Sequence, residues 1–98
     1  SFTLSQNMPN PFNPSTTLRF SLPEAGHVTL AVYDVNGRLV RNLLVGVAAP
    51  AAQAFLPGHH EVVWDGKDDN GRAVASGVYL ARLTASQGVV TRKMTLLR

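Results

Sequence analysis

Short runs in which apolar and polar residues alternate, each closed by a turn signal, are the feature that most constrains how this chain folds. Between Thr17 and Leu22 every second residue is apolar, which is the period of a strand that buries one face. A second run covers His27–Asp34. The Asn36-Gly37 pair that follows is typical of a tight hairpin turn, and Arg38–Leu44 is its expected partner strand. The pattern predicts antiparallel strands rather than helices.

The second half of the chain continues in the same way. We expect strands at His59–Asp65, Val78–Ala85 and Val89–Leu97, with a tight turn at Asp69-Asn70-Gly71. The final run carries polar residues on both faces, as expected of a strand at a sheet edge. About seven short strands without a helical period predict an all-β fold, a two-sheet antiparallel β-sandwich. No internal sequence repeat is apparent.

One domain is the expected organisation, because 98 residues suffice for a single core and leave no room for a second. Residues 1–16 are a proline-rich lead-in. Since proline fixes its own φ and favours an extended residue before it, we expect an ordered, non-helical segment there. Residues 45–58 are alanine-rich and contain Pro50 and Pro57. We interpret them as a long connection between the sheets, with one or two helical turns over Ala48–Phe55 as the alternative.

Composition narrows the class of protein. Hydrophobic residues make up 45% and charged residues 15% of the chain, which excludes a highly charged disordered segment. Without cysteine there is neither a disulfide nor a thiolate metal site. Ser1–Leu4 lacks the basic and apolar regions of a signal peptide. An export signal is therefore expected upstream in a parent chain, or within the domain itself.

The C-terminal third of the chain is basic. After Asn70 it has no acidic residue, and its five cations are Arg72, Arg82, Arg92, Lys93 and Arg98. Such a surface suits an anionic partner such as lipopolysaccharide, a membrane or nucleic acid. The alternative, which we favour, is a set of solvated outward positions on alternating strands. No glycine-rich phosphate loop or RNA-binding aromatic motif occurs, so no nucleic acid partner is expected.

Two groups of polar residues could bind a metal, and each has a plainer interpretation. The carboxylates of Asp65–Gly71 could ligate calcium, but their spacing does not fit a helix-loop-helix site, and we favour a turn in which Asp and Asn bond their own backbone. The histidines are His27, His59 and His60. The adjacent pair on one strand points to opposite faces and so cannot chelate one metal. No catalytic spacing is present, so we expect neither enzyme activity nor a cofactor.

Aromatic side chains form a third candidate group. Exposed rings on a sandwich bind sugars by stacking, and the candidates here are Trp64, Tyr33, Tyr79, Phe12 and Phe55. We favour packing in the core, because Tyr33, Trp64 and Tyr79 lie within apolar strands.

Several motifs, in order along almost the whole chain, resemble one known family. They are Gln6–Thr17 (Gln-Asn-Met-Pro-Asn-Pro-Phe-Asn-Pro-Ser-Thr-Thr), Val32–Val40, His60–Gly66, Gly71, Ala75–Tyr79, Arg92–Met94 and Leu97-Arg98. Together they are similar to the type A C-terminal sorting domains of type IX secretion cargo. Those domains are related in sequence to the immunoglobulin-like domain of the flagellar hook-capping protein. The resemblance implies that the sandwich is immunoglobulin-like.

The resemblance also implies a function. Such domains are non-catalytic secretion and surface-attachment modules at the C-terminus of larger exported proteins, with a catalytic or adhesive domain upstream. The implied partners are the outer-membrane type IX machinery and a surface sortase, with anionic lipopolysaccharide as a further candidate. The implied location is the medium or the cell surface, reached through the periplasm. The recognition residues carried over by motif are Gly77, Val78, Tyr79 and Lys93 in the last strands, and Asp34, Gly37 and Arg38 in the earlier hairpin.

Each of these residues also has a structural interpretation. Gly77 would permit a turn or bulge, Asn36-Gly37 is required by the hairpin itself, and Lys93 and Arg98 are charges that discourage sheet-to-sheet aggregation. Two other functions stay open. One is a carbohydrate-binding or adhesive accessory domain, which exposed coplanar rings would favour. The other is a structural assembly domain like that of the flagellar cap, which self-association would favour.

Overall fold

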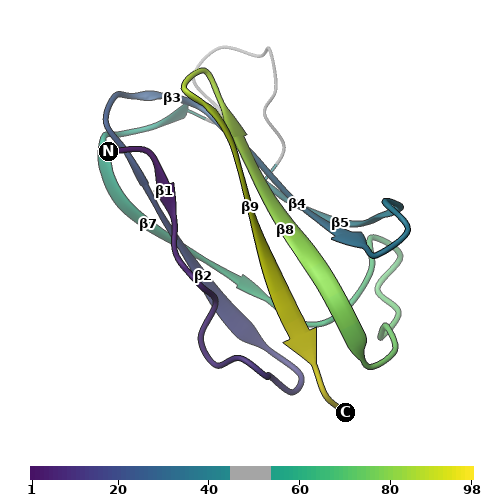
Figure 1. Ribbon diagram of the computed structural model, residues 1–98. Helices are drawn as coiled ribbons and strands as arrows, with labels where there is room; N and C mark the ends of the chain where they lie inside the picture. Colours follow the sequence, from purple (N-terminus) through teal and green to yellow (C-terminus); the bar gives the residue numbers. More distant parts are fainter. Residues whose placement is uncertain (45–53) are drawn as a thin grey trace.

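The computed structural model describes residues 1–44 and 54–98, which form strands, turns and loops but no helix (Figure 1). None of these residues therefore belongs to a helix that is long and apolar enough to cross a membrane. The strands in chain order are β1 (Thr3–Leu4), β2 (Thr16–Leu22), β3 (Gly26–His27), β4 (Thr29–Asp34), β5 (Leu39–Leu44), β6 (Ala54–Phe55), β7 (Gly58–Trp64), β8 (Gly77–Ala85) and β9 (Gly88–Leu96).

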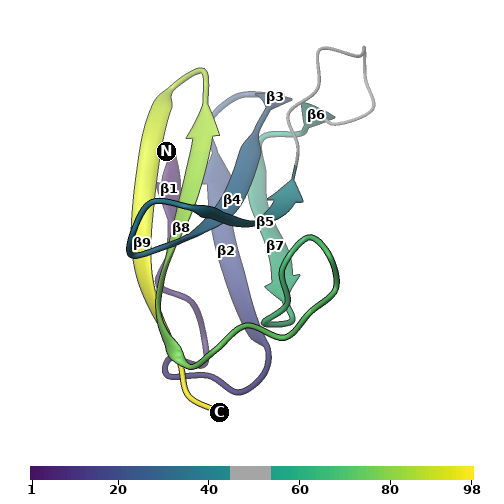
Figure 2. The same cartoon turned by 90° about the vertical axis from the view of Figure 1, so that its right-hand side faces the viewer.

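Seven of these strands make two antiparallel sheets packed face to face (Figures 1 and 2). One sheet has the order β1-β2-β7 and the other the order β5-β4-β8-β9, while β3 and β6 form a separate two-stranded ribbon. Every strand pair is antiparallel. The predicted two-sheet sandwich of about seven strands, and its immunoglobulin-like class, are confirmed.

Alternation along the strands explains which residues fill the space between the sheets. Leu18, Phe20 and Leu22 of β2 point inwards, as predicted, and meet Leu30 and Val32 of β4; each is at most 3% exposed. The remaining strands add further fully buried side chains, namely Trp64, Ala81, Leu83, Met94 and Leu96. Burying a large apolar side chain contributes about 1.5–3 kcal/mol relative to leaving it in water, so this core is the main source of stability.

Three differences from the expected strands have local causes. The strand expected at His27–Asp34 is interrupted at Val28, because β3 pairs with β6 whereas β4 belongs to the four-stranded sheet. The ribbon strand β6 lies inside the expected connection at residues 45–58, so helical turns over Ala48–Phe55 are wrong for residues 54 and 55; residues 45–53 lie outside the described part of the chain. Strand β1 was not expected, because two residues are too few to show alternation.

The lead-in at residues 1–16 runs along the outer edge of β9 and closes its C-terminal half. The Phe12 amide donates to the Thr95 carbonyl at 3.0 Å, and the Phe12 carbonyl accepts from the Leu97 amide at 3.0 Å. Asn10 Oδ1 accepts from the Thr95 amide at 3.0 Å. These contacts satisfy backbone groups that a bare edge would leave open to pairing with another chain.

A buried amide holds the lead-in in shape. Asn7 is 1% exposed, and its Nδ2 donates to Thr16 Oγ1 at 3.0 Å and to the Pro9 carbonyl at 3.1 Å. The Thr16 hydroxyl also donates to that carbonyl at 2.8 Å. A buried polar group is tolerated only when it is hydrogen-bonded, so these bonds fix the path of the proline-rich segment.

Candidate recognition surface

The recognition residues predicted in the last strands lie in the β8–β9 hairpin. Gly77, Val78 and Tyr79 begin β8, and Lys93 of β9 lies opposite Leu80. Val78 and Lys93 are exposed, whereas Tyr79 is 7% exposed and belongs to the core. Two of the four predicted residues therefore present a side chain on the surface.

Tyr79 links the core to the segment that leads into β8. Its hydroxyl donates to the Ala75 carbonyl at 2.6 Å, and its ring packs edge-on against Trp64 with centroids 5.4 Å apart. Burial raises the pKa of the Tyr79 hydroxyl above its ordinary value, and the Asp34 carboxylate raises this pKa further, whereas the Arg98 guanidinium lowers it. Asp34 is the cross-strand partner of Tyr79.

This raised pKa predicts an alkaline loss of stability. The unfolded chain ionises Tyr79 at the usual pKa near 10, whereas the folded chain resists ionisation until a higher pH. The contribution is therefore complete below about pH 10 and is lost as the pH rises through the folded pKa. We expect the free energy of unfolding, measured in urea, to fall more steeply above about pH 10 in the wild type than in Tyr79→Phe. Parallel curves for the two proteins would contradict the assignment.

Asp34, Gly37 and Arg38 form the turn of the β4–β5 hairpin. Asp34 Oδ1 accepts from the amides of Asn36 at 2.9 Å and Arg38 at 3.0 Å, and the Gly37 amide donates to the Asp34 carbonyl at 3.0 Å. Gly37 has φ of +82°, a conformation that glycine adopts without strain. The predicted hairpin is confirmed, and the polar groups of Asp34 are used within it.

The same turn occurs a second time at Asp68–Arg72. Asp68 Oδ1 accepts from the amides of Asn70 at 2.9 Å and Arg72 at 3.0 Å, and the Gly71 amide donates to the Asp68 carbonyl at 3.0 Å. Both turns have the sequence Asp-x-Asn-Gly-Arg. The expectation of no internal repeat is therefore wrong for this five-residue turn. The shared Asp-x-Asn-Gly-Arg sequence was a signal that could have revealed the repeated turn.

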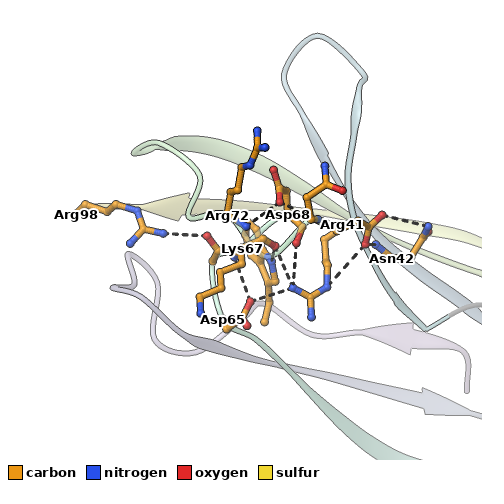
Figure 3. Close-up of polar contacts among 11 residues, drawn as sticks. Arg41, Asn42, Asp65, Lys67, Asp68, Arg72 and Arg98 are labelled. Carbon is orange, nitrogen blue, oxygen red and sulfur yellow. Dashed lines mark hydrogen bonds and ion pairs between the residues drawn. The ribbon is translucent and has the colours of Figure 1, made fainter.

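Arg41 ties the loop that carries this second turn to β5 (Figure 3). Its Nη1 lies 3.2 Å from Asp65 Oδ1 and 3.2 Å from the Lys67 carbonyl oxygen, and its Nε lies 3.9 Å from Asp69 Oδ1. Asp69 Oδ1 also accepts from the Asn42 amide at 2.9 Å. The outer edge of β5 is thus capped by the loop rather than left open.

The carboxylates of this loop are occupied by the protein itself. Asp65 Oδ1 accepts from the Lys67 amide at 3.1 Å, and Asp68 and Asp69 bond the backbone as described above. The turn interpretation of Asp65–Gly71 is confirmed. Within residues 1–44 and 54–98, no group of three or more His, Asp or Glu side chains is arranged to hold a metal ion.

Arg98 fastens the end of β9 to the same loop (Figure 3). Its Nη2 donates to the Gly66 carbonyl at 2.9 Å, its Nε to the Val74 carbonyl at 2.6 Å, and its backbone amide to Ser76 Oγ at 2.8 Å. Gly66 ends the His60–Gly66 motif but was not among the predicted recognition residues. It has φ of +73°, and a Cβ there would lie 2.7 Å from the Pro14 carbonyl oxygen and 3.1 Å from Arg98 Nη2. The lead-in, the loop and the chain end converge on this glycine.

Replacing Gly66 by alanine is expected to destabilise the domain through this close approach. Gly71→Ala is a matched control, because Gly71 has φ of +80° but no heavy atom within 4 Å of its Cβ position. Both changes carry the cost of positive φ, about 1 kcal/mol, so their difference isolates the clash. We expect Gly66→Ala to lower the free energy of unfolding by about 2 kcal/mol more than Gly71→Ala, measured by urea denaturation. Equal losses of stability in the two variants would mean that the backbone around Pro14 moves aside without a measurable loss of free energy.

The histidines and aromatic rings lie as the plainer interpretations predicted: the adjacent histidines face opposite ways, and Trp64 and Tyr79 pack in the core. His59 is exposed and His60 half-buried, so the adjacent histidines do point to opposite faces; the His60 ring lies 5.3 Å from that of Phe20. Trp64 packs between Phe12 and Tyr79 in the core, with centroid distances of 5.6 and 5.4 Å. These rings are tilted or edge-on to one another.

The other two candidate rings are half-buried. Tyr33 lies beneath Arg82, whose Cζ is 4.7 Å from the ring centroid, and Phe55 packs edge-on against Phe20. No pair of phenylalanine, tyrosine or tryptophan rings among the described contacts is coplanar. The sugar-stacking platform that a carbohydrate-binding function would use is not formed by these side chains.

A shallow groove of about 400 Å³ lies on the three-stranded sheet. Its lining includes Thr3, Ser5, His59 and the ion pair of Arg19 with Glu61, whose Nε–Oε2 distance is 2.5 Å. Both charged side chains are at least half exposed, so the pair contributes little stability. The outer face of this sheet is mostly polar, with Val63 as an exposed apolar exception, and Arg19 and Glu61 neutralise each other there.

Comparisons with known proteins agree with this fold. Residues 10–88 match the family model described as the FlgD Ig-like domain. Over 64 residues, which is 65% of the chain, it is 38% identical to the basal-body rod modification protein FlgD of Salmonella typhimurium; the FlgD of Salmonella typhi gives the same values. The chain spans about a quarter of the length of these curated relatives.

Solved structures contain similar domains. In the crystal structure of dimeric latent PorU from Porphyromonas gingivalis, a similar region covers 99% of this chain and 9% of PorU, with a TM-score of 0.71 and 25% identity. PorZ, a surface component of the type-IX secretion system of the same organism, matches all of this chain over 12% of its own length, with a TM-score of 0.57 and 18% identity. Because the family model matches most of the chain, the protein belongs to the FlgD Ig-like domain family.

Proposed function

We propose that this chain is a non-catalytic sorting domain, through which a larger exported protein is recognised by the type IX outer-membrane machinery and delivered to the cell surface or the medium. The observation that carries the proposal is that this sandwich matches, over nearly its whole length, domains of PorU and PorZ, the second of which is a type-IX surface component. The motifs shared with sorting domains along the chain support it independently. A surface sortase and lipopolysaccharide are the partners proposed for attachment after export.

The geometry favours recognition of a folded domain rather than of a loose tail. The last strand is part of the core, since Met94 and Leu96 are fully buried, and Arg98 is bonded to the loop. A partner that binds β9 and Arg98 therefore contacts a rigid surface. Preorganisation of this kind lowers the entropy lost on binding.

A partner could also bind by adding a strand to one of the sheets, but only a few sheet edges are open to such pairing. The Lys93 carbonyl accepts from Gln6 Nε2 at 2.7 Å, and the lead-in covers Thr95 and Leu97. The N-terminal half of β9, around Val89, and the outer edge of β7 carry no such cap among the described residues. These are the edges where an added strand would find free backbone groups.

Self-association is the main competing function, because the sequence is 38% identical to part of FlgD, a basal-body rod modification protein. An assembly domain of that kind would associate with copies of itself or occupy the interior of a longer chain. Sedimentation velocity at micromolar concentration separates the two functions. A monomer that sorts a fused cargo fits the proposal, whereas a concentration-dependent oligomer without sorting activity fits an assembly domain.

The proposal predicts that removing Val89–Arg98 from a cargo fusion leaves the cargo in the periplasm. Since this deletion also removes Met94 and Leu96 from the core, Trp64→Ala serves as a comparison that weakens the fold but keeps the final strand intact. Fractionation and immunoblotting measure how much of each fusion stays in the periplasm. If both fusions are retained, the machinery recognises the folded sandwich; if only the deletion is retained, it recognises the sequence of the last strand. Normal export of the deletion would contradict the proposal.

A further inference from the structure

An apolar row crosses the outer face of the four-stranded sheet. Leu39 of β5 lies opposite Tyr33 of β4, Tyr33 lies opposite Leu80 of β8, and Leu80 lies opposite Lys93 of β9. Antiparallel sheets of a sandwich usually carry polar side chains on the face that meets water, as the three-stranded sheet does here. This row departs from that rule.

Several side chains of the row and its borders are open to solvent. Leu39 is 50% exposed and Val78, two residues before Leu80 on the same face of β8, is 36% exposed. Val35, which follows β4, is 67% exposed. Single exposed apolar residues are ordinary, but neighbouring ones on one face of a sheet mark an interaction surface.

Two cations border the row without acidic partners. The Arg82 guanidinium carbon lies 4.7 Å from the Tyr33 ring centroid, so the ring holds it over the face, and Lys93 ends the row. Neither cation takes part in an ion pair among the described residues. The outward positions of β4, β5, β8 and β9 contain no acidic residue. The face is thus apolar and positive.

We propose that this face, centred on Tyr33, Leu80, Arg82 and Lys93, docks a protein segment that carries carboxylates beside aliphatic side chains. Charge complementarity identifies the occupant, since the planar fork of an arginine held over a ring suits bidentate pairing with a carboxylate. Beside this face the partner lies across the sheet rather than extending it, because the loop caps β5 and the lead-in caps β9 from Lys93 to Leu97. This surface is inferred independently of the route by which the parent protein is exported.

A second copy of the chain is a poor occupant. A copy would have to supply carboxylates, yet five of its six acidic side chains are already bonded within the described structure: Asp34, Glu61, Asp65, Asp68 and Asp69. Only Glu24 accepts no described bond. We therefore expect the carboxylates to come from a segment outside these 98 residues.

Titration of isotope-labelled protein with short capped peptides tests the proposal by NMR. The probes are soluble strand-forming peptides that alternate Glu with Leu, Lys with Leu, and Glu with Ser. We expect only the Glu-Leu peptide to shift the amides of Tyr33, Leu80 and Arg82 in a saturable way. In the double variant Arg82→Gln/Lys93→Gln, its affinity should fall roughly tenfold, because two charge-assisted contacts are lost.

A matched variant and a lipid probe complete the test. Arg19→Gln/Arg72→Gln makes the same change in net charge at two positions outside the four-stranded sheet and should leave the affinity of the Glu-Leu peptide within about twofold. Circular dichroism verifies that both double variants are folded. Equal binding of the Lys-Leu peptide, no binding of any peptide, or an equal loss in both variants would overturn the proposal. So would cosedimentation with phosphatidylglycerol vesicles that depends on Arg82 and Lys93 while the Glu-Leu peptide does not bind.

Discussion

Trp64→Ala is expected to lower the free energy of unfolding by about 3–5 kcal/mol, a large part of the 5–15 kcal/mol that a domain of this size has in total. Trp64 is fully buried, packs against Phe12 and Tyr79, and donates from Nε1 to the Lys67 carbonyl at 2.9 Å. Alanine would remove this packing and the indole donor to the Lys67 carbonyl, which would keep only Arg41 Nη1 at 3.2 Å. Urea denaturation followed by circular dichroism measures the loss, since the change removes the only tryptophan.

Two control variants define what the Trp64 result means. Trp64→Phe keeps a ring in the core and should cost less than Trp64→Ala, with the lost Lys67 bond as its main deficit. Val63→Ala alters the neighbouring residue, which is 60% exposed, and should change the stability by about 0.5 kcal/mol or less. A Trp64→Ala protein as stable as Val63→Ala would show that the ring is not central to the fold.

Deleting residues 1–14 is expected to have the second large effect, a loss of about 5 kcal/mol or more together with self-association. The deletion removes Leu4 and Phe12, each at most 2% exposed, and each worth about 1.5–3 kcal/mol before the cost of the cavity is added. It also uncovers backbone groups of Thr95 and Leu97 on the edge of β9. Bare edges pair with other chains, so the shortened protein should sediment as oligomers or aggregates.

Met8→Ala is the matched control for the deletion, because Met8 lies in the same lead-in but is 64% exposed. This change should leave both the stability and the monomeric state unaltered. A monomeric deletion protein that unfolds at the wild-type urea concentration would mean that the lead-in is an appendage rather than part of the sandwich.

The strands could be predicted because their signal is local. Alternation at Thr17–Leu22 and the Asn36-Gly37 turn depend on neighbouring residues alone, and both are found in the structure close to their expected positions. The two shortest strands in the N-terminal half could not be predicted for the same reason: β1 was not expected, and His27 of β3 was assigned to the same strand as β4. β1 and β3 have two residues each and exist because β2 and β6 lie beside them, which no local pattern records.

The candidate surface was harder to predict from the sequence, because it depends on which strands pair with one another and in which register. That Tyr79 is buried while Val78 faces solvent follows from alternation. The row from Leu39 through Tyr33 and Leu80 to Lys93, however, requires the order of four strands and two bulges between β4 and β5. Likewise, Gly66 matters only because Pro14 and Arg98 meet there.

The most direct test of the sorting proposal is the fraction of a fluorescent fusion that leaves the cell. The 98 residues are joined to the C-terminus of a periplasm-directed fluorescent protein, and the fusion is expressed in a bacterium with type IX secretion and in its translocon mutant. The proposal predicts fluorescence at the surface or in the medium of the first strain, and in the periplasm of the second. An intact, folded fusion retained in the periplasm of both strains would contradict it.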